Sequence, residues 1–204
     1  MKKITSIFLI TILYGCGSSV SPVDQGLIDQ VMHIGNGSEP QGLDPHIVTG
    51  VPEHHLLITM CEGLTISNPE GGANLPGMAE SWDISEDGRT YIFNIRKDAK
   101  WSNGDDFTAE DIVWSWMRVL TPSLGSQYPD MLYYLVGAED FNTGVITDFS
   151  EVGVKALDNK TLEVNLINPT PFFLGLLSHY STWPVHKETV LKFGEIDDRQ
   201  GLWT

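Results

Sequence analysis

Three of the six histidines lie close enough in the sequence to suggest metal chemistry. His54 and His55 are adjacent in the chain, and His46 lies a short way upstream. Adjacent residues on a helix point about 100° apart, and the sequence has no H-E-x-x-H motif that would place two ligands on one helical face. We therefore expect no metal site, and we interpret these histidines as solvated residues on a helix surface.

Catalytic chemistry finds no support in the sequence. Chain order groups no serine, histidine and acidic residue into a triad, although triads are assembled in space. Gly35 and Gly37 lack the continuation of a G-x-G-x-x-G phosphate loop. We expect no enzyme and no cofactor, and an envelope lipoprotein hydrolase or metal binder is kept as the alternative class.

Cys16 is the candidate for covalent modification. Lys2 and Lys3 precede an apolar run of ten residues, Ile4 to Leu13, which is too short to span a bilayer of about 30 Å. Residues 1–15 are therefore predicted to be a signal peptide. The segment 13–16, Leu-Tyr-Gly-Cys, resembles a lipoprotein cleavage box, so we expect a lipid on Cys16. Ordinary secretion, with the cysteine merely nearby, is the alternative.

Cys61 is then the only other thiol in the chain. It has no intrachain disulfide partner once Cys16 carries a lipid, and its apolar neighbours Leu57, Ile58 and Leu64 predict a buried, unreactive residue. Residues 16–30 are small and polar and are predicted to be a tether to the membrane. Gly17 after the lipid-bearing cysteine favours the outer membrane if the organism has one.

The composition is that of a folded, acidic protein. The 204 residues are 41% hydrophobic and 19% charged, which is enough for a sizeable core in one or two domains. The formal net charge of −15 at pH 7 argues against a nucleic-acid partner, because binding to phosphates needs clustered Lys and Arg.

A hairpin followed by a helix forms the centre of the predicted fold. Trp82 and Ile84 alternate with polar residues, the segment 86–88 supplies turn residues, and apolar residues of period two follow over 91–95. Thr108 and Asp111 predict a capped helix that ends before Pro122. Its apolar stripe is formed by Ile112, Val113, Trp116, Met117 and Leu120.

Further elements make the predicted fold class mixed α/β. We expect a strand at 31–34, a second hairpin from 152–156 and 161–167, and a turn-rich stretch at 64–76. Helices are expected at 53–61, 128–136, 171–179 and 188–193.

The central stretch also resembles the family-5 extracellular solute-binding proteins, and within them the peptide-binding members. The strand ending in Arg-Lys-Asp-Ala-Lys-Trp-Ser-Asn-Gly at 96–104 and the helix opening Thr-Ala-Glu-Asp at 108–111 carry this likeness, which extends in order from about Gly35 to Gly194. The resemblance implies a two-lobed periplasmic-binding-protein-like fold of class II. Because relatives are much longer, we expect the N-terminal part only, without the C-terminal lobe.

The resemblance also implies a division of the chain. Residues 31–61 would open lobe I, residues 62–185 would form a smaller α/β domain, and residues 186–204 would begin a truncated return into lobe I.

Four residues are candidates for ligand binding by the same resemblance. Thr49, Gly50 and Val51 lie in a segment that offers backbone groups to a peptide as a neighbouring strand would, and Tyr128 matches an aromatic residue near the ligand's N-terminal half. Tyr128 has an alternative reading as a packing residue whose hydroxyl points outward.

The function implied is that of a monomeric lipoprotein receptor in the cell envelope. It would be periplasmic and membrane-anchored, and would capture oligopeptides for the permease subunits of an ABC importer. Dipeptides, nickel, haem or sugars are the alternative ligands on the same fold.

Overall fold

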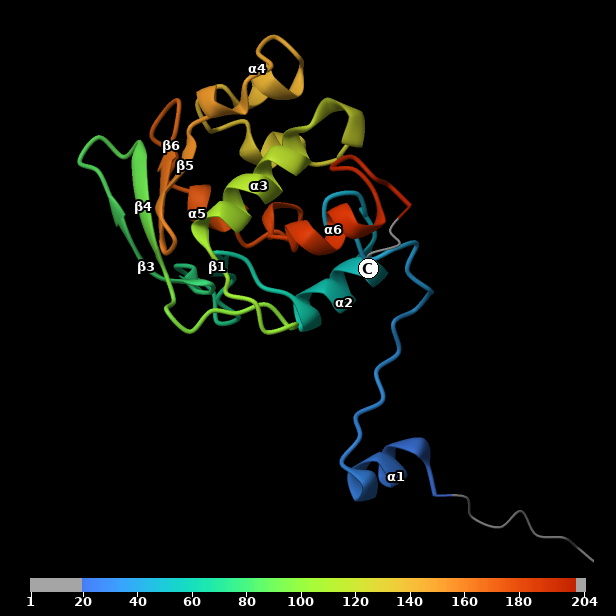
Figure 1. The fold of residues 1–204 in the computed structure, drawn as a ribbon. Coiled ribbons are helices and arrows are strands. Elements are labelled where there is room, and N and C mark those ends of the chain that lie inside the picture. The colour runs from blue at the N-terminus through green and yellow to red at the C-terminus, as the bar shows by residue number, and fades with distance from the viewer. Residues whose placement is uncertain (1–19, 201–204) are drawn as a thin grey trace, which may run out of the picture. The chain divides into compact units, whose positions relative to one another are not determined.

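The computed structural model describes residues 20–200 of the chain. The chain divides into two compact units, Met1–Gly37 and Ser38–Thr204, which are described separately. Figure 1 traces the elements of both units in chain order. Cys16 and the signal sequence at 1–15 lie outside the described residues, so their expected processing stays a prediction.

The first unit contains a helix where a polar tether was expected. Helix α1 (Pro22–Asp29) begins at Ser21, whose Oγ accepts a hydrogen bond from the Asp24 N–H at 3.1 Å. A serine cap followed by proline at the first helical position is a strong helix start. Residues 22–29 are therefore helical, and the tether expected over 16–30 stays a prediction.

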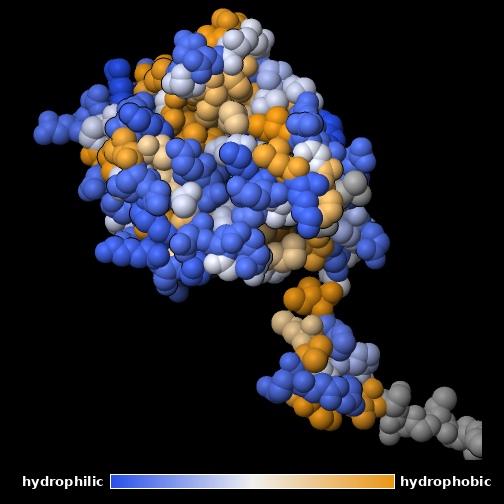
Figure 2. All heavy atoms as spheres, in the orientation of Figure 1, coloured by the Kyte–Doolittle hydropathy of each residue, from blue (hydrophilic) through white to orange (hydrophobic). Residues whose placement is uncertain are grey.

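The strand expected at 31–34 is also absent from the structure. Both sheets among residues 20–200 are built from strands β1 to β6, all in the second unit. Residues 31–34 have no neighbouring strand to satisfy their N–H and C=O groups, and a single strand is not stable alone. Met32 and Ile34 are 84% and 74% exposed, and Figure 2 shows apolar residues on the surface of this unit.

A four-stranded antiparallel sheet lies in the second unit, in the order β3-β4-β6-β5. Strands β3 (Ala79–Ile84) and β4 (Thr90–Ile95) form the first predicted hairpin, and β5 (Val154–Asp158) and β6 (Thr161–Asn165) form the second. Phe93 pairs with Leu162 across the β4–β6 ladder, and both side chains are fully buried. The predicted alternation is confirmed for β4 and β6, whereas in β3 Trp82 is only partly buried and Ile84 is 48% exposed.

Helix α3 (Ala109–Leu120) covers one face of this sheet, as Figure 1 shows. Asp111 accepts a hydrogen bond from the Thr108 N–H at 2.7 Å, so the predicted cap is confirmed. Trp116 is fully buried, and its Nε1 donates to the Thr182 carbonyl at 2.9 Å. The predicted apolar stripe therefore packs into the core, as periodicity 3.6 requires.

The other elements are short. Strands β1 (Thr65–Ile66) and β2 (Leu75–Pro76) pair with each other within the predicted turn-rich stretch. Around them lie α2 (Val51–Met60), α4 (Ala138–Asn142), α5 (Phe173–Leu176), α6 (Lys187–Phe193) and the 3-10 turns η1 (Pro122–Leu124), η2 (Pro129–Leu132), η3 (Phe149–Glu151) and η4 (Tyr180–Thr182).

Two predicted helices are shorter than expected. The apolar segment 128–136 forms only η2, which begins at Pro129, and the segment 171–179 contains only α5 between turns. Apolar residues in these segments instead bury themselves from turns, as Leu135 does while it forms an isolated bridge with Leu166. Short apolar runs do not distinguish a helix from buried irregular chain.

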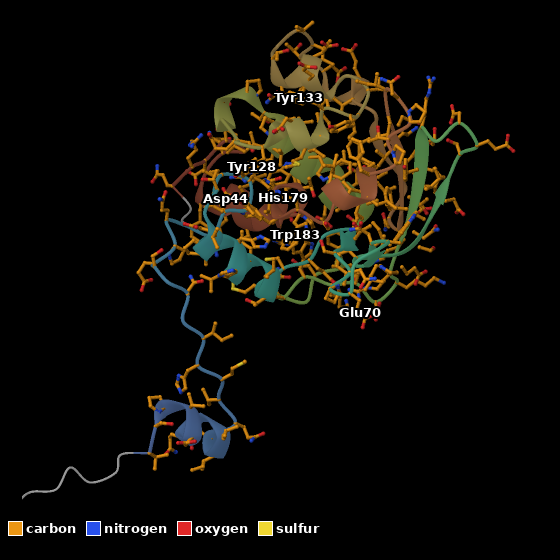
Figure 3. All side chains as sticks on the ribbon, turned by 180° about the vertical axis from the view of Figure 1, so that it is seen from behind. Asp44, Glu70, Tyr128, Tyr133, His179 and Trp183 are labelled. Atoms are coloured by element: carbon orange, nitrogen blue, oxygen red, sulfur yellow. The ribbon has the colours of Figure 1, made fainter. Side chains whose placement is uncertain are left out.

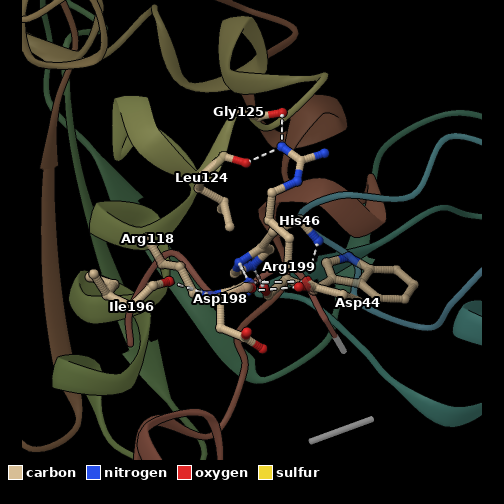
Figure 4. A network of polar contacts seen from close by, with 9 residues as sticks. Asp44, His46, Arg118, Leu124, Gly125, Ile196, Asp198 and Arg199 are labelled. Atoms are coloured by element: carbon tan, nitrogen blue, oxygen red, sulfur yellow. Dashed lines mark hydrogen bonds and ion pairs between the residues drawn. The ribbon is translucent and has the colours of Figure 1, made fainter. Parts of the chain in front are cut away.

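A buried polar cluster joins distant segments of the second unit. Arg118 on α3 forms an ion pair with Asp44 at 2.7 Å and donates to the backbone carbonyls of Ile196 and Asp198, at 2.9 and 3.0 Å. Figure 4 shows these contacts converging on the guanidinium group. Arg199, close by in sequence, donates to the carbonyl oxygens of Leu124 and Gly125.

His46 belongs to this cluster, which corrects the expectation of a solvated histidine. Its side chain is buried, with Nδ1 at 2.9 Å from Arg118 Nη1 and Nε2 at 2.8 Å from the Trp183 carbonyl. Burial lowers the pKa of His46 to about 4. Since arginine can only donate, Nδ1 is the acceptor and Nε2 carries the proton of the neutral ring.

Cys61 is exposed, so the prediction of a buried thiol is wrong. Helix α2 ends at Met60, and Cys61 follows it in an extended conformation with φ −130° and ψ 161°. The change of direction takes the side chain away from the buried side of α2, which Leu57 occupies.

Among residues 20–200 no helix is long and apolar enough to cross a membrane.

Candidate functional site

Residues 49–51 form an open stretch of backbone at the start of α2. Gly50 is the N-cap residue, Thr49 is exposed, and the Val51 side chain is 65% exposed. Within residues 20–200 the N–H groups of these three residues have no hydrogen-bond partner. Unpaired donors at an accessible edge are the feature that an extended chain can use for pairing.

The buried side chain of Glu53 supports the backbone conformation of residues 49–51. It is 3% exposed, and its Oε1 accepts a hydrogen bond from the Gln41 N–H at 2.6 Å. A Cβ placed on Gly50 would lie 1.9 Å from Glu53 Oε2, so any larger residue would force the Glu53 side chain out of its present position. The open backbone is therefore held against a buried acidic side chain.

Tyr128 lies beside this stretch in the structure. Tyr128 and Val48, the residue before Thr49, both pack on one apolar cluster formed by Leu57, Tyr180 and Trp183. The Tyr180 hydroxyl donates to the Val48 carbonyl at 3.1 Å. The structure thus brings the two predicted site segments, almost 80 residues apart in the sequence, onto a common support.

His179 and Tyr180 extend the aromatic surface around Tyr128. The rings of Tyr128 and His179 meet edge to face with centroids 5.2 Å apart, and those of His179 and Tyr180 are 4.2 Å apart. Figure 3 shows Tyr128, His179 and Trp183 as near neighbours. Burial lowers the pKa of His179, and burial together with the Tyr128 hydroxyl raises the pKa of Tyr180 to about 12. Both side chains are therefore neutral at pH 7.

Sequence reasoning did not single out His179 or Tyr180. The pair follows an apolar segment, which favours reading it as the end of a helix. The only signal in the sequence is the clustering of aromatic and histidine residues over 179–183. Their contact with Tyr128 depends on the tertiary fold.

His54 and His55 are not arranged as metal ligands. His55 is exposed, as expected, whereas His54 is half-buried with its ring 5.6 Å from that of Tyr180. In the described part of the chain, no three His, Cys, Asp or Glu residues lie together in a way that could hold a metal ion. The site offers backbone donors, aromatic rings and neutral polar groups.

Open backbone donors beside aromatic rings are groups with which a solute-binding protein can hold a ligand. The chain belongs to the bacterial extracellular solute-binding proteins, family 5, because the model of that family's middle region matches residues 75–201. This result confirms the resemblance found in the sequence.

Curated relatives and solved structures agree with this assignment. The chain is 46% identical over 162 residues to the periplasmic oligopeptide-binding protein OppA of Escherichia coli. This alignment covers 78% of the chain and 29% of that protein. It is 36% identical over 202 residues to the oligopeptide-binding protein OppA of Bacillus subtilis, covering 94% of this chain and 37% of that protein.

A solved relative carries a peptide. The crystal structure of Haemophilus influenzae OppA in complex with RPPGFSPFR matches with a TM-score of 0.74 and 39% identity, covering 82% of this chain and 33% of that chain. The chain therefore spans about a third of the length of these relatives. The match confirms a partial two-lobed binding-protein fold.

Proposed function

We propose that this chain is the peptide-contacting N-terminal part of an oligopeptide receptor that serves an ABC importer. The observation that carries the proposal is the open backbone at 49–51 beside Tyr128, on a fold shared with a peptide-bound relative. Several relatives are named as oligopeptide-binding proteins, and this supports oligopeptides over other solutes as the ligand.

The ligand would bind through its main chain. An extended peptide laid along Thr49, Gly50 and Val51 would accept hydrogen bonds from their N–H groups, as an added strand does. Tyr128 would lie against the ligand's N-terminal half. Such backbone pairing is independent of sequence, so the receptor would accept varied peptides.

The remaining parts of the receptor follow from the same proposal. Residues 31–61 and 186–204 would belong to lobe I and residues 62–185 to the smaller domain, with a second lobe closing over the peptide. The receptor would act in the periplasm, attached to a membrane through a lipid on Cys16, and would pass its ligand to permease subunits. No nucleic acid, metal or cofactor takes part.

A chimera tests the proposal. The aligned residues of this chain replace those of the Escherichia coli relative, with which they share 46% identity. After exposure to a mixed peptide library, bound peptides are identified by mass spectrometry, with the unmodified relative as control. We expect the chimera to retain peptides of several sequences. A chimera that folds, by thermal unfolding, and retains none would contradict the proposed function.

A matched pair of glycine variants localises the binding. Gly50→Ala in the chimera places a methyl group against Glu53 and should weaken peptide binding at least about tenfold through distortion of the 49–51 backbone. Gly35→Ala is the control, because a Cβ there meets nothing within 4 Å. Equal peptide affinity in both variants would remove residues 49–51 from the site.

A further inference from the structure

A pocket of about 450 Å³ opens beside α2 in the second unit. His54 and Ile58, one turn apart on α2, line it together with Cys61, the residue that follows the helix. Trp183 and Ser178 line it from the segment that follows α5. None of these residues belongs to the backbone-pairing stretch at 49–51.

Trp183 gives the pocket a rigid apolar wall. The side chain is 4% exposed, and a Cβ on Gly63 would lie 2.4 Å from Trp183 Cδ1 and 2.6 Å from Nε1. The indole therefore packs closely against the Gly63 backbone. Among the described residues its Nε1 has no acceptor, so the ring is held by packing alone.

Three of the polar residues that line the pocket, Glu62, Ser67 and Ser178, already have polar partners. Glu62 forms an ion pair with Arg96 at 2.6 Å, and the Ser67 hydroxyl donates to the Ser178 hydroxyl at 2.9 Å. The Glu62 carboxylate is thus neutralised, and a cationic ligand would have to compete with Arg96. Ile58, which is 50% exposed, offers the pocket its accessible apolar side chain, and Trp183, which is 4% exposed, adds a small area.

The pocket lies close to the proposed peptide site along α2. His54 follows Val51 by three residues, about one helical turn or 5 Å along the axis. A side chain leaving a peptide that pairs with residues 49–51 spans a distance of this order. The same cluster of Leu57, Tyr180 and Trp183 supports both the pocket and Tyr128.

We propose that this pocket receives a large apolar or aromatic side chain of the bound peptide. The inference rests on the proposed function and adds a side-chain preference to it. An aromatic side chain would pack against Ile58 and the accessible part of Trp183 and bury apolar area that a methyl group would leave exposed. Backbone pairing would then admit many peptides, and this pocket would rank them.

Nuclear magnetic resonance on the full chain tests the pocket without a second lobe. The chain carries Cys16→Ser so that no lipid is attached, and the Trp183 indole N–H signal is identified from its loss in Trp183→Phe. The probes are N-acetyl-phenylalaninamide, N-acetyl-alaninamide and N-acetyl-lysinamide at millimolar concentrations. We expect the phenylalanine probe to shift the Trp183 signal and to bind at least about fivefold more tightly than the others.

Filling the pocket provides the matched control. Cys61→Leu places extra methyl groups at the pocket wall and should weaken binding of the phenylalanine probe at least about fivefold. The adjacent Met60 is exposed and does not line this pocket, so Met60→Leu should leave binding of the probe unchanged. Equal binding of the three probes, tighter binding of the lysine probe, or no effect of Cys61→Leu would overturn the proposal.

The two proposals fail separately. If the chimera retains peptides but the phenylalanine probe leaves Trp183 unshifted in this chain, the pocket is wrongly assigned and the proposed function stands. If the probe binds beside Trp183 but the folded chimera retains no peptide, the proposed function is wrong, and the assignment of the pocket to a peptide side chain is lost with it.

Discussion

Arg118 and Asp44 form a bidentate ion pair in the interior, with Nη1 at 3.0 Å from Oδ1 and Nη2 at 2.7 Å from Oδ2. The side chain of Arg118 is 0% exposed and that of Asp44 is 5% exposed. The pair ties α3 to the loop that leads toward residues 49–51. The position of the proposed peptide-binding edge therefore depends on an interaction remote from it.

Removing one partner of this pair should be strongly destabilising. Asp44→Asn leaves a buried guanidinium without its counter-charge, and breaking a buried pair costs about 3–5 kcal/mol. Urea unfolding of the variant measures the loss. The exposed pair of Lys100 and Asp106 is the control, because solvent screens it and Asp106→Asn there should cost far less stability. Equal losses in the two variants would contradict the role of Arg118.

His46 should make the stability depend on pH below neutrality. Its pKa is about 4 in the folded chain and 6.5 as the ordinary value, so the unfolded chain takes up the proton first as the pH falls. The stabilisation is complete above pH 6.5 and is lost progressively as the pH falls from 6.5 to 4. The loss amounts to about 3 kcal/mol from this residue.

The measurement is the free energy of unfolding between pH 7 and pH 4, compared with His46→Gln. The glutamine keeps polar atoms near Arg118 and the Trp183 carbonyl but does not titrate, so it should flatten the pH dependence. His55→Gln, at an exposed position, should leave the dependence unchanged. An identical slope in wild type and His46→Gln would show that other groups cause it.

Trp116 should contribute to the stability of the fold and not to ligand binding. It is fully buried in the core, and Trp116→Ala leaves a cavity expected to cost about 3–5 kcal/mol. Trp116→Phe should cost less, since it loses mainly the hydrogen bond to the Thr182 carbonyl at 2.9 Å. A Trp116→Ala variant that keeps its melting temperature but loses ligand would contradict this reading.

Lipid attachment at Cys16 is tested in cells. Cells expressing the chain are labelled with a palmitate analogue, and the label on the protein is compared between wild type and Cys16→Ser. We expect label only in the wild type, because Cys61 has no lipoprotein box before it. Absence of label in the wild type, or equal label in the variant, would leave ordinary secretion as the explanation.

Local patterns predicted the elements that depend on neighbouring residues. The two hairpins and α3 follow from alternation, turn residues and a cap, and all are found close to their expected bounds. The strand at 31–34 failed because a strand also needs a partner, which no pattern within it can supply. Cys61 was misjudged because α2 has more apolar residues than its buried side holds, with Ile58 and Met60 exposed.

The site was predicted only in part, for the same reason. The family resemblance supplied residues 49–51 and Tyr128, but their common support on Tyr180 and Trp183 joins positions more than 100 residues apart. The Arg118–Asp44 pair likewise spans 74 residues. Such contacts depend on tertiary packing, so the local propensity of the sequence cannot predict them.

The chain alone should bind peptide weakly. Ligand sites typically bury 70–90% of a small ligand, whereas this chain supplies one wall and a side pocket. A few backbone hydrogen bonds at residues 49–51 contribute about 0.5–1.5 kcal/mol each, which barely offsets the roughly 4–15 kcal/mol lost in association entropy. We therefore expect dissociation constants in the millimolar range or weaker. Calorimetry with the segment from Gly17 onward and a mixture of tri- to pentapeptides measures this, with the chimera as the positive control. Micromolar binding by the segment alone would show that the complete peptide site lies within these residues.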